Sequence, residues 1–211
     1  MNEALVLGNG ESRYSVDLNS LKDNFVLIGC NAVQRDITVD HLICCDQRMI
    51  VESLNNQSTK DSLIYVRAMY YRQYRKLQKE KNVRLLPEVP TTGQNKRDDP
   101  THWGSGPYAV LLASTLGFQN ITMLGFDLYG NKEKVNNLYK NTPNYSKGDT
   151  RAVDYSFWLY QIQQIFLTYP ETNYKIVNIA DWAMPAEWKR NNITFENIES
   201  FRTANNQLTV L

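Results

Sequence analysis

Two glycines near the N-terminus have the spacing of a loop that binds a phosphate. The motif Gly8-Asn9-Gly10-Glu11-Ser12 directly follows a short apolar run that predicts a buried strand. Glycines let the backbone turn tightly and approach a ligand closely. Backbone N–H groups, together with the Ser12 hydroxyl, can bind a phosphate or a ribose. The motif is neither a complete G-x-G-x-x-G nor a Walker A loop, and an ordinary tight turn is the alternative.

Polar side chains follow several predicted strands at the point where each strand ends. In an open α/β sheet these ends meet at one edge, where ligands bind. Each residue alone is also compatible with a structural cap, but their recurrence favours a nucleotide site. The residues are Asn31, Asp46, Gln47, Asp127 and Tyr129.

A small-residue turn precedes the most apolar stretch of the chain. Ser105 and Gly106 come directly before the helix predicted over 107–116, and a helix N-terminus attracts anions. A simple cap at Ser105 is the alternative. His102 lies in the polar loop before this turn and is our candidate acid or base near neutral pH. The other histidine, His41, lies in an apolar run and is expected in the core.

These residues need a framework, and the apolar pattern predicts one. Short apolar runs alternate with amphipathic stretches, as in a Rossmann-like α/β fold. We expect a single domain over 1–211, with a largely parallel, doubly wound sheet flanked by helices. The expected strands are 4–7, 24–29, 41–45, 63–66, 83–86, 121–124 and 174–177, and the expected helices are 69–81, 107–116 and 151–169. A short strand and helix are expected within 193–201. Of the two polar loops, 87–106 and 130–150, the second has the length of a lid.

Composition limits the class of protein. With 23 Lys and Arg against 22 Asp and Glu, the formal net charge is +1, which excludes a DNA-coating protein and a disordered acidic chain. No stretch approaches the roughly 18 apolar residues of a membrane span, and the N-terminus lacks the pattern of a signal peptide. The three cysteines lie in apolar surroundings, which is typical of reduced core thiols. We therefore expect a cytoplasmic protein.

The order of the motifs resembles that of bacterial sialyltransferases of glycosyltransferase family 42. The matching segments are GNGES, CN and SGPYAVLLASTLGFQNITMLGFDLY, within about residues 4–47 and 104–129. A related group includes the archaeal 6-hydroxymethylpterin diphosphokinases. The resemblance implies a Rossmann-like domain that transfers a sugar from a CMP-sugar donor to a glycan or small-molecule acceptor, without a metal or other required cofactor.

The resemblance also implies which residues bind the donor. The loop Gly8–Gly10 would hold the nucleotide, and Asn31 would reach the donor. Ser105 and Gly106 would contact the ribose, the base or the sugar carboxylate.

By the same resemblance, the catalytic roles fall on tyrosines and on an acid or base. Tyr129 would bond the leaving phosphate, and a second tyrosine from the following loop, Tyr139 or Tyr145, would complete the pair. These sialyltransferases use a late histidine as general base, but this chain has no histidine after His102. His102 is therefore our candidate base, with Asp127 as a further catalytic candidate.

Magnesium-dependent diphosphoryl transfer from ATP is the alternative chemistry. The chain has no Asp-x-Asp triplet of the kind that holds a metal in many glycosyltransferases. A diphosphokinase would instead hold Mg²⁺ between carboxylates and phosphates. Asp46 and Asp127 are the candidate ligands for that reaction, and the pair Asp98-Asp99 is a third candidate.

A basic segment over 67–84 leaves a non-catalytic binding domain open. It combines Lys and Arg with Tyr70, Tyr71 and Tyr74, a composition that can bind single-stranded nucleic acid by charge and stacking. Helical spacing favours a plainer interpretation, with the tyrosines and Leu77 facing the core. An anionic glycan acceptor is the remaining alternative for this face. We do not expect nucleic acid as a partner, and a homo-oligomer stays open.

Overall fold

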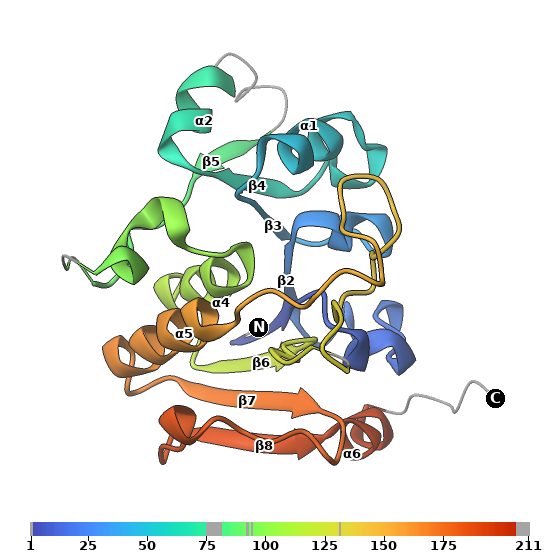
Figure 1. The fold of residues 1–211 in the computed structure, drawn as a ribbon, viewed down its shortest axis with the longest axis vertical. Coiled ribbons are helices and arrows are strands. Elements are labelled where there is room, and N and C mark those ends of the chain that lie inside the picture. The colour runs from blue at the N-terminus through green and yellow to red at the C-terminus, as the bar shows by residue number, and fades with distance from the viewer. Residues whose placement is uncertain (1, 75–81, 92, 94, 131, 206–211) are drawn as a thin grey trace.

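The fold is built on one sheet in which every strand pairs in parallel. The computed structural model describes residues 2–74, 82–91, 93, 95–130 and 132–205. Within them, the 8-stranded sheet has the order β5-β4-β3-β2-β1-β6-β7-β8 (Figure 1). The strands are β1 Glu3–Leu7, β2 Val26–Cys30, β3 His41–Cys44, β4 Leu63–Val66, β5 Val83–Leu85, β6 Asn120–Leu124, β7 Asn173–Asn178 and β8 Ile193–Asn197. The expected Rossmann-like α/β architecture is confirmed.

Helices cover both faces of this sheet. The α-helices are α1 Gln47–Asn55, α2 Ala68–Tyr74, α4 Ser105–Thr115, α5 Ser156–Thr168 and α6 Ile198–Ala204. The 3-10 helices are η1 Glu11–Ser15, η2 Asn19–Leu21, η3 Asn31–Arg35, η4 Gln57–Thr59, η6 Lys96–Asp98, η7 Pro100–His102 and η8 Ala186–Trp188. α4 and α5 pack together on one face, and α1 and α6 lie on the other (Figure 1). In the described part of the chain, no helix is both long and apolar enough to cross a membrane.

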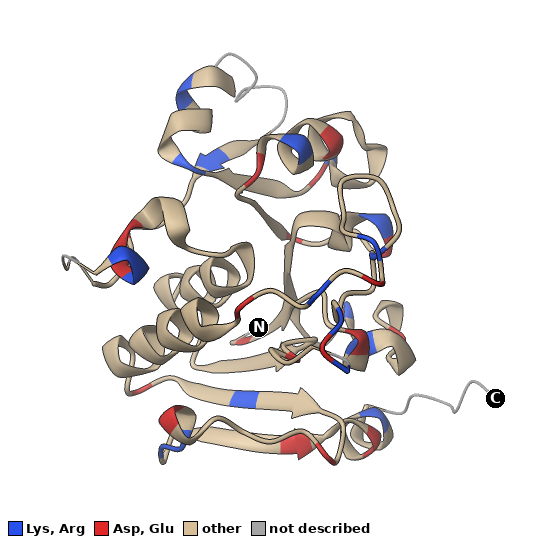
Figure 2. Ribbon diagram, viewed as in Figure 1, with Lys and Arg blue, Asp and Glu red and all other residues tan. Residues whose placement is uncertain are grey.

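The central strands are buried on both sides. In β1, Ala4 and Val6 belong to the core cluster under α4 and α5, whereas Leu5 and Leu7 belong to the cluster under α1 and α6. A strand buried on both faces is a continuous apolar run rather than an alternating one. α4 is apolar nearly all round because it lies between the sheet and α5, and neither helix carries a charged residue (Figure 2).

Helices account for the main differences from the expected elements. α1 was not among them, because Met49, Ile50 and Leu54 form a narrow apolar stripe in an otherwise polar segment. α5 begins at Ser156 rather than at residue 151, since Asp154 accepts hydrogen bonds from both the Ser156 N–H and its hydroxyl. The strand and helix expected near the C-terminus are confirmed as β8 and α6.

The basic segment 67–84 contributes α2 and β5 to the fold. Tyr70, Tyr71 and Tyr74 are partly buried and pack against the core cluster under α1. This packing agrees with the plainer interpretation of their spacing. The rest of the expected helix, including Leu77, lies outside the described residues.

The sheet reverses its direction of growth at β1. Strands β2 to β5 extend it on one side and β6 to β8 on the other, so the topological switch point lies between β1 and β6. The Gly8 N–H donates to the Leu124 carbonyl at 2.8 Å, and the Gly10 N–H donates to the Gly125 carbonyl at 2.9 Å. A Cβ on Gly8 would lie 2.3 Å from the Gly125 oxygen, so this approach requires glycine.

We expect Gly125→Ala to lower the free energy of unfolding more than Gly117→Ala does. Both glycines have positive φ, +77° and +84°, so each alanine carries the left-handed strain of about 1–2 kcal/mol. Only at Gly125 does the new Cβ meet other atoms, with the Gly8 oxygen at 2.8 Å, which adds about 1–3 kcal/mol. Urea denaturation followed by circular dichroism measures the difference. Equal losses in the two variants would contradict the close approach of the two loops.

Candidate functional site

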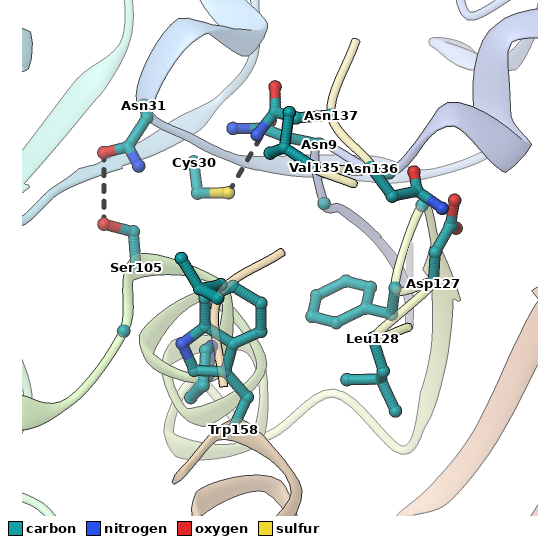
Figure 3. A pocket seen from close by; sticks show the side chains of 18 of the residues that line it. Asn9, Cys30, Asn31, Ser105, Asp127, Leu128, Val135, Asn136, Asn137 and Trp158 are labelled. Carbon is teal, nitrogen blue, oxygen red and sulfur yellow. Dashed lines mark hydrogen bonds between the residues drawn. The ribbon is translucent and has the colours of Figure 1, made fainter. Parts of the chain in front are cut away.

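The carboxyl edge of the sheet contains a cavity above the ends of the paired strands β1 and β6. Its volume is about 450 Å³, within the range of small-molecule sites. The loops after β1, β2, β3 and β6 line it together with the N-terminus of α4 (Figure 3). Residues 132–155, which we call the lid, supply another part of the wall.

Most of the residues predicted from the sequence line this cavity. They are Gly8, Asn9, Gly10, Asn31, Asp46, His102, Ser105, Gly106, Asp127, Tyr129 and Tyr145. Ser12, Gln47 and Tyr139 are not part of its wall. We expect polar residues that follow different strands to lie close together, because the carboxyl ends of parallel strands share one edge of the sheet. This expectation brings together residues from distant parts of the chain.

Asp127 locks the loop that follows β1. Its carboxylate accepts hydrogen bonds from the Ser12 N–H at 2.9 Å and from the Ser12 hydroxyl, and the Asn178 amide nitrogen lies 3.4 Å away. A Cβ on Gly10 would overlap the same carboxylate, at 2.3 Å from its carbon. The Ser12 hydroxyl therefore holds the loop in shape, and both oxygens of Asp127 already have protein donors.

The first turn of α4 forms one wall of the cavity. Gly104 precedes the helix and offers no side-chain cap, and the Ser105 hydroxyl donates to the Asn31 amide oxygen at 3.1 Å (Figure 3). Asn31 adopts a left-handed φ of 51°, a conformation that asparagine tolerates. Because a helix N-terminus carries free N–H groups and partial positive charge, this wall suits a phosphate or a carboxylate.

Arg67 adds positive charge to the cavity wall. Its guanidinium donates to the carbonyls of Thr101 and Trp103, the second at 2.7 Å, and its Nε is buried without a partner. Carbonyl oxygens do not neutralise a cation, and among the described residues no carboxylate forms an ion pair with Arg67. Lys140 also lines the cavity but is paired with Glu11. The side of the cavity next to Arg67 therefore suits an anionic group of a ligand, whereas Asp46 and Asp127 place negative charge elsewhere on the wall.

Apolar side chains complete the wall, and no sequence motif indicated them. Phe126 and Leu128 follow β6, and Trp158 comes from the first turn of α5 (Figure 3). Leu128 has a φ of +64°, a strained conformation for a bulky residue and one that tends to occur at functional sites. Trp158 reaches the cavity through the packing of α5 on α4, which no local spacing predicts.

Two cysteines also line the cavity. Cys30 and Cys45 stand at the ends of β2 and β3, so the rule about strand ends would have found them had thiols been included. All three cysteines are free and buried, as expected for core thiols. Burial raises the pKa of Cys30 to about 12. These thiols are therefore protonated at neutral pH and contribute a weakly polar surface.

Two candidate catalytic side chains lie on the wall with protein partners in place. The Tyr129 hydroxyl donates to the Ala183 carbonyl at 2.9 Å, and burial raises the pKa of Tyr129. The His102 Nδ1 lies 3.2 Å from the Thr101 hydroxyl and 3.4 Å from an Asp99 oxygen. Either side chain would have to exchange a partner before it could act on a substrate through these atoms.

The buried Arg13, which forms an ion pair with the exposed Asp36, fastens the lid to the loop after β1. Arg13 is 3% exposed. Its Nε donates to the Gly8 carbonyl at 2.7 Å, and one terminal nitrogen donates to Asp36 at 3.0 Å and to the Tyr139 hydroxyl at 2.5 Å. The same hydroxyl donates to Asp36 at 2.5 Å. Tyr139 is therefore a buried anchor of the lid.

Tyr145 is the lid tyrosine that lines the cavity. Its hydroxyl accepts a hydrogen bond from the Asn9 amide at 3.1 Å and lies 3.4 Å from the Ala32 N–H. Burial raises the pKa of Tyr145, so the hydroxyl keeps its proton. This residue connects the lid to the loops after both β1 and β2.

A second clamp joins the lid to η3 and α1. Arg35 donates to both carboxylate oxygens of Glu52, at 2.6 and 2.7 Å, and to the Thr142 hydroxyl and the Pro143 carbonyl of the lid. Asn144 donates to Glu52 at 3.0 Å. The hydrogen bonds from Arg35 are the main cause that lowers the pKa of Glu52.

The candidate magnesium ligands have different surroundings. Within the described residues, no group of three or more His, Cys, Asp and Glu side chains is arranged to hold a metal ion. Asp127 is 8% exposed and bonded to Ser12, whereas Asp46 is exposed at the start of α1. The pair Asp98-Asp99 belongs to η6 and η7, where Asp98 accepts from Thr91 and from Tyr160.

We expect Tyr139→Phe to lower the free energy of unfolding by about 1.5–3 kcal/mol, the range for hydrogen bonds to charged groups. The ring still packs, but Arg13 and Asp36 each lose a partner inside the protein. Chemical denaturation measures the loss. The exposed Tyr14 supplies the control, since Tyr14→Phe should change stability by less than about 0.5 kcal/mol. Equal stabilities of the two variants would contradict the anchoring role.

The pair of Arg35 and Glu52 should make stability depend on pH in the acid range. Folding lowers the pKa of Glu52 from its ordinary value of 4.5. The stabilisation is therefore complete above that pH and is lost as the pH falls through the lowered value. Glu52→Gln should flatten this part of the stability profile, whereas Glu171→Gln at an exposed site should not. Urea denaturation at a series of pH values measures both slopes, and an unchanged slope in Glu52→Gln would refute the assignment.

No family model matches this chain, and no curated protein or solved structure matches it either. The resemblance to family 42 therefore rests on the sequence motifs alone, and the function has to be inferred from the cavity.

Proposed function

We propose that the chain is a nucleotide-sugar-dependent glycosyltransferase whose donor binds in the larger cavity, at the carboxyl ends of β1 and β6. The observation that carries the proposal is that the loop Gly8–Gly10, the N-terminus of α4 and the unpaired charge of Arg67 all line one cavity. Doubly wound sheets bind nucleotides at this position. A CMP-sugar is the donor class that the motifs suggest.

The donor phosphate is the group that suits the α4 side of the cavity. The N–H groups of Ser105 and Gly106 begin the helix, and the Asn31 amide and the Arg67 guanidinium belong to the same wall. Such donors bind phosphate through charge-assisted hydrogen bonds. The planar base and the sugar ring suit the apolar remainder of the wall, which includes Trp158.

The same groups would stabilise the phosphate as it leaves. Fixed N–H groups and a cation at the site of developing charge lower the barrier without a metal ion. In this proposal they take the role that the resemblance gives to Tyr129, whose hydroxyl is held by the Ala183 carbonyl. The proposed transfer therefore needs no metal ion.

The two alternatives have less support. For a diphosphokinase, the described residues offer no group of three or more His, Cys, Asp and Glu side chains that could hold Mg²⁺, and Asp127 accepts hydrogen bonds from Ser12. A nucleic-acid-binding surface would need free tyrosines on α2, but Tyr70, Tyr71 and Tyr74 pack against the core.

We expect CMP and CMP-N-acetylneuraminate to raise the melting temperature equally in the presence of Mg²⁺ and of EDTA. Thermal-shift titration with these ligands, UMP, AMP and ATP tests this, followed by calorimetric titration of those that bind. Stabilisation by ATP only in the presence of Mg²⁺ would favour the diphosphokinase instead. If no nucleotide raises the melting temperature, the proposed function is wrong.

Two matched variants test whether the donor phosphate binds beside the N-terminus of α4. Asn31→Asp keeps the acceptor for Ser105 but adds a negative charge beside the α4 N-terminus, and we expect it to weaken CMP binding at least tenfold, about 1.4 kcal/mol. Asn141→Asp is the control. Asn141 is also left-handed, with φ 63°, its side-chain oxygen accepts from the Gly148 N–H, and it lies outside the cavity wall. Equal affinities of the two variants would contradict this position for the phosphate.

A further inference from the structure

A second, smaller cavity adjoins the site. It has a volume of about 370 Å³, and its wall shares Asn31, Asp46 and Tyr145 with the larger cavity. The rest of its lining is mainly polar and includes Gln47 and Arg48 from the first turn of α1. The two cavities therefore meet at the carboxyl ends of β2 and β3.

Asp46 stands at the boundary between the two cavities with its carboxylate unengaged. It directly precedes α1 but makes no side-chain cap hydrogen bond. Within the part of the chain that the structure describes, the Asp46 carboxylate has no hydrogen-bond donor and no ion-pair partner. Asp127, the other carboxylate on the wall, is 8% exposed and accepts from Ser12 through both oxygens. Of these two, Asp46 is the carboxylate that has no protein donor to give up before it accepts a proton from a ligand.

We propose that the smaller cavity is the acceptor subsite and that Asp46 is the general base of the transfer. The inference rests on the proposed function, because the smaller cavity can serve as an acceptor site only if the sugar donor binds in the larger one. Amide groups of Asn31, Gln47 and Asn144, with the Arg48 guanidinium, line the subsite. Such groups hydrogen-bond hydroxyls, so the acceptor class is a sugar or another polyhydroxylated molecule.

The step balances without any further reactant. The acceptor O–H bond breaks, and its proton passes to the Asp46 carboxylate. The acceptor oxygen forms a bond to the anomeric carbon of the donor sugar. The bond between that carbon and the phosphate oxygen breaks, and its electron pair leaves with the nucleotide. Asp46 would thus be the general base that the absence of a late histidine leaves unassigned. It would act in place of His102, whose Nδ1 lies beside Thr101 and Asp99.

Asp46→Asn tests the base, with CMP-N-acetylneuraminate as donor and water as the simplest acceptor. We expect the variant to bind the donor within about twofold of wild type and to release CMP at least about 100-fold more slowly, the contribution of a general base. Azide needs no deprotonation, so adding sodium azide should restore CMP release and yield the glycosyl azide. Asp61→Asn is the control, because Asp61 is an exposed aspartate outside both cavities.

Gln47→Trp tests the subsite. Gln47 lines the smaller cavity and not the larger one, so a bulky side chain should lower transfer to lactose far more than it lowers the hydrolysis of CMP-N-acetylneuraminate. Lactose transfer equal to that of wild type would overturn the acceptor subsite.

The outcomes separate the two proposals. If the wild-type protein neither binds nor turns over CMP-N-acetylneuraminate, the proposed function fails, and this inference fails with it. If the wild-type protein is active and Asp46→Asn releases CMP at the wild-type rate, the proposed function stands and the base assignment is wrong. Slow release that azide does not restore would also overturn the base assignment, since it would show a structural defect.

Discussion

The buried guanidinium of Arg13 is the interaction on which the rest of the site depends. A charge that is 3% exposed is tolerated only when it is fully paired, because its desolvation is costly. Here the partners come from three parts of the chain: Gly8 after β1, Asp36 after η3 and Tyr139 in the lid. Pairing this one cation therefore fixes both the turn that follows the first strand and the course of the lid across the sheet edge.

The same sheet edge gives two carboxylates opposite properties. Asp127 follows β6 at the point where the loop after β1 approaches most closely, so Ser12 occupies both of its oxygens. Asp46 follows β3, farther along the sheet from that crossing, and has only a helix start beside it. Because of this topology, Asp127 holds the loop after β1 in place, whereas Asp46 is exposed to the two cavities. Residue type alone does not distinguish them.

The positively charged side chains near the cavity are also of two kinds, those paired with a carboxylate and one that is not. Lys140 meets Glu11 and Arg35 meets Glu52, so these cations hold the lid in place. Arg67 donates to carbonyl oxygens and has no carboxylate partner among the described residues, so its positive charge faces the cavity. With the N-terminus of α4 on the same wall, this side of the cavity is positive, whereas Asp46 and Asp127 place negative charge elsewhere on the wall and Trp158 adds apolar surface. A nucleotide matches that combination, since it has one anionic part and one flat apolar part.

The sequence by itself determined the parallel sheet, the buried helix α4 and the edge at which the site lies. Both faces of the sheet are buried, so its strands are continuous apolar runs, and the carboxyl ends of parallel strands share one edge. Only the tertiary structure decided which polar groups at that edge are free. Ser12 is bonded to Asp127, 115 residues away, and Tyr139 to Arg13, 126 residues away. Hydrogen bonds depend on proximity in space, and the spacing of residues along the chain does not encode it.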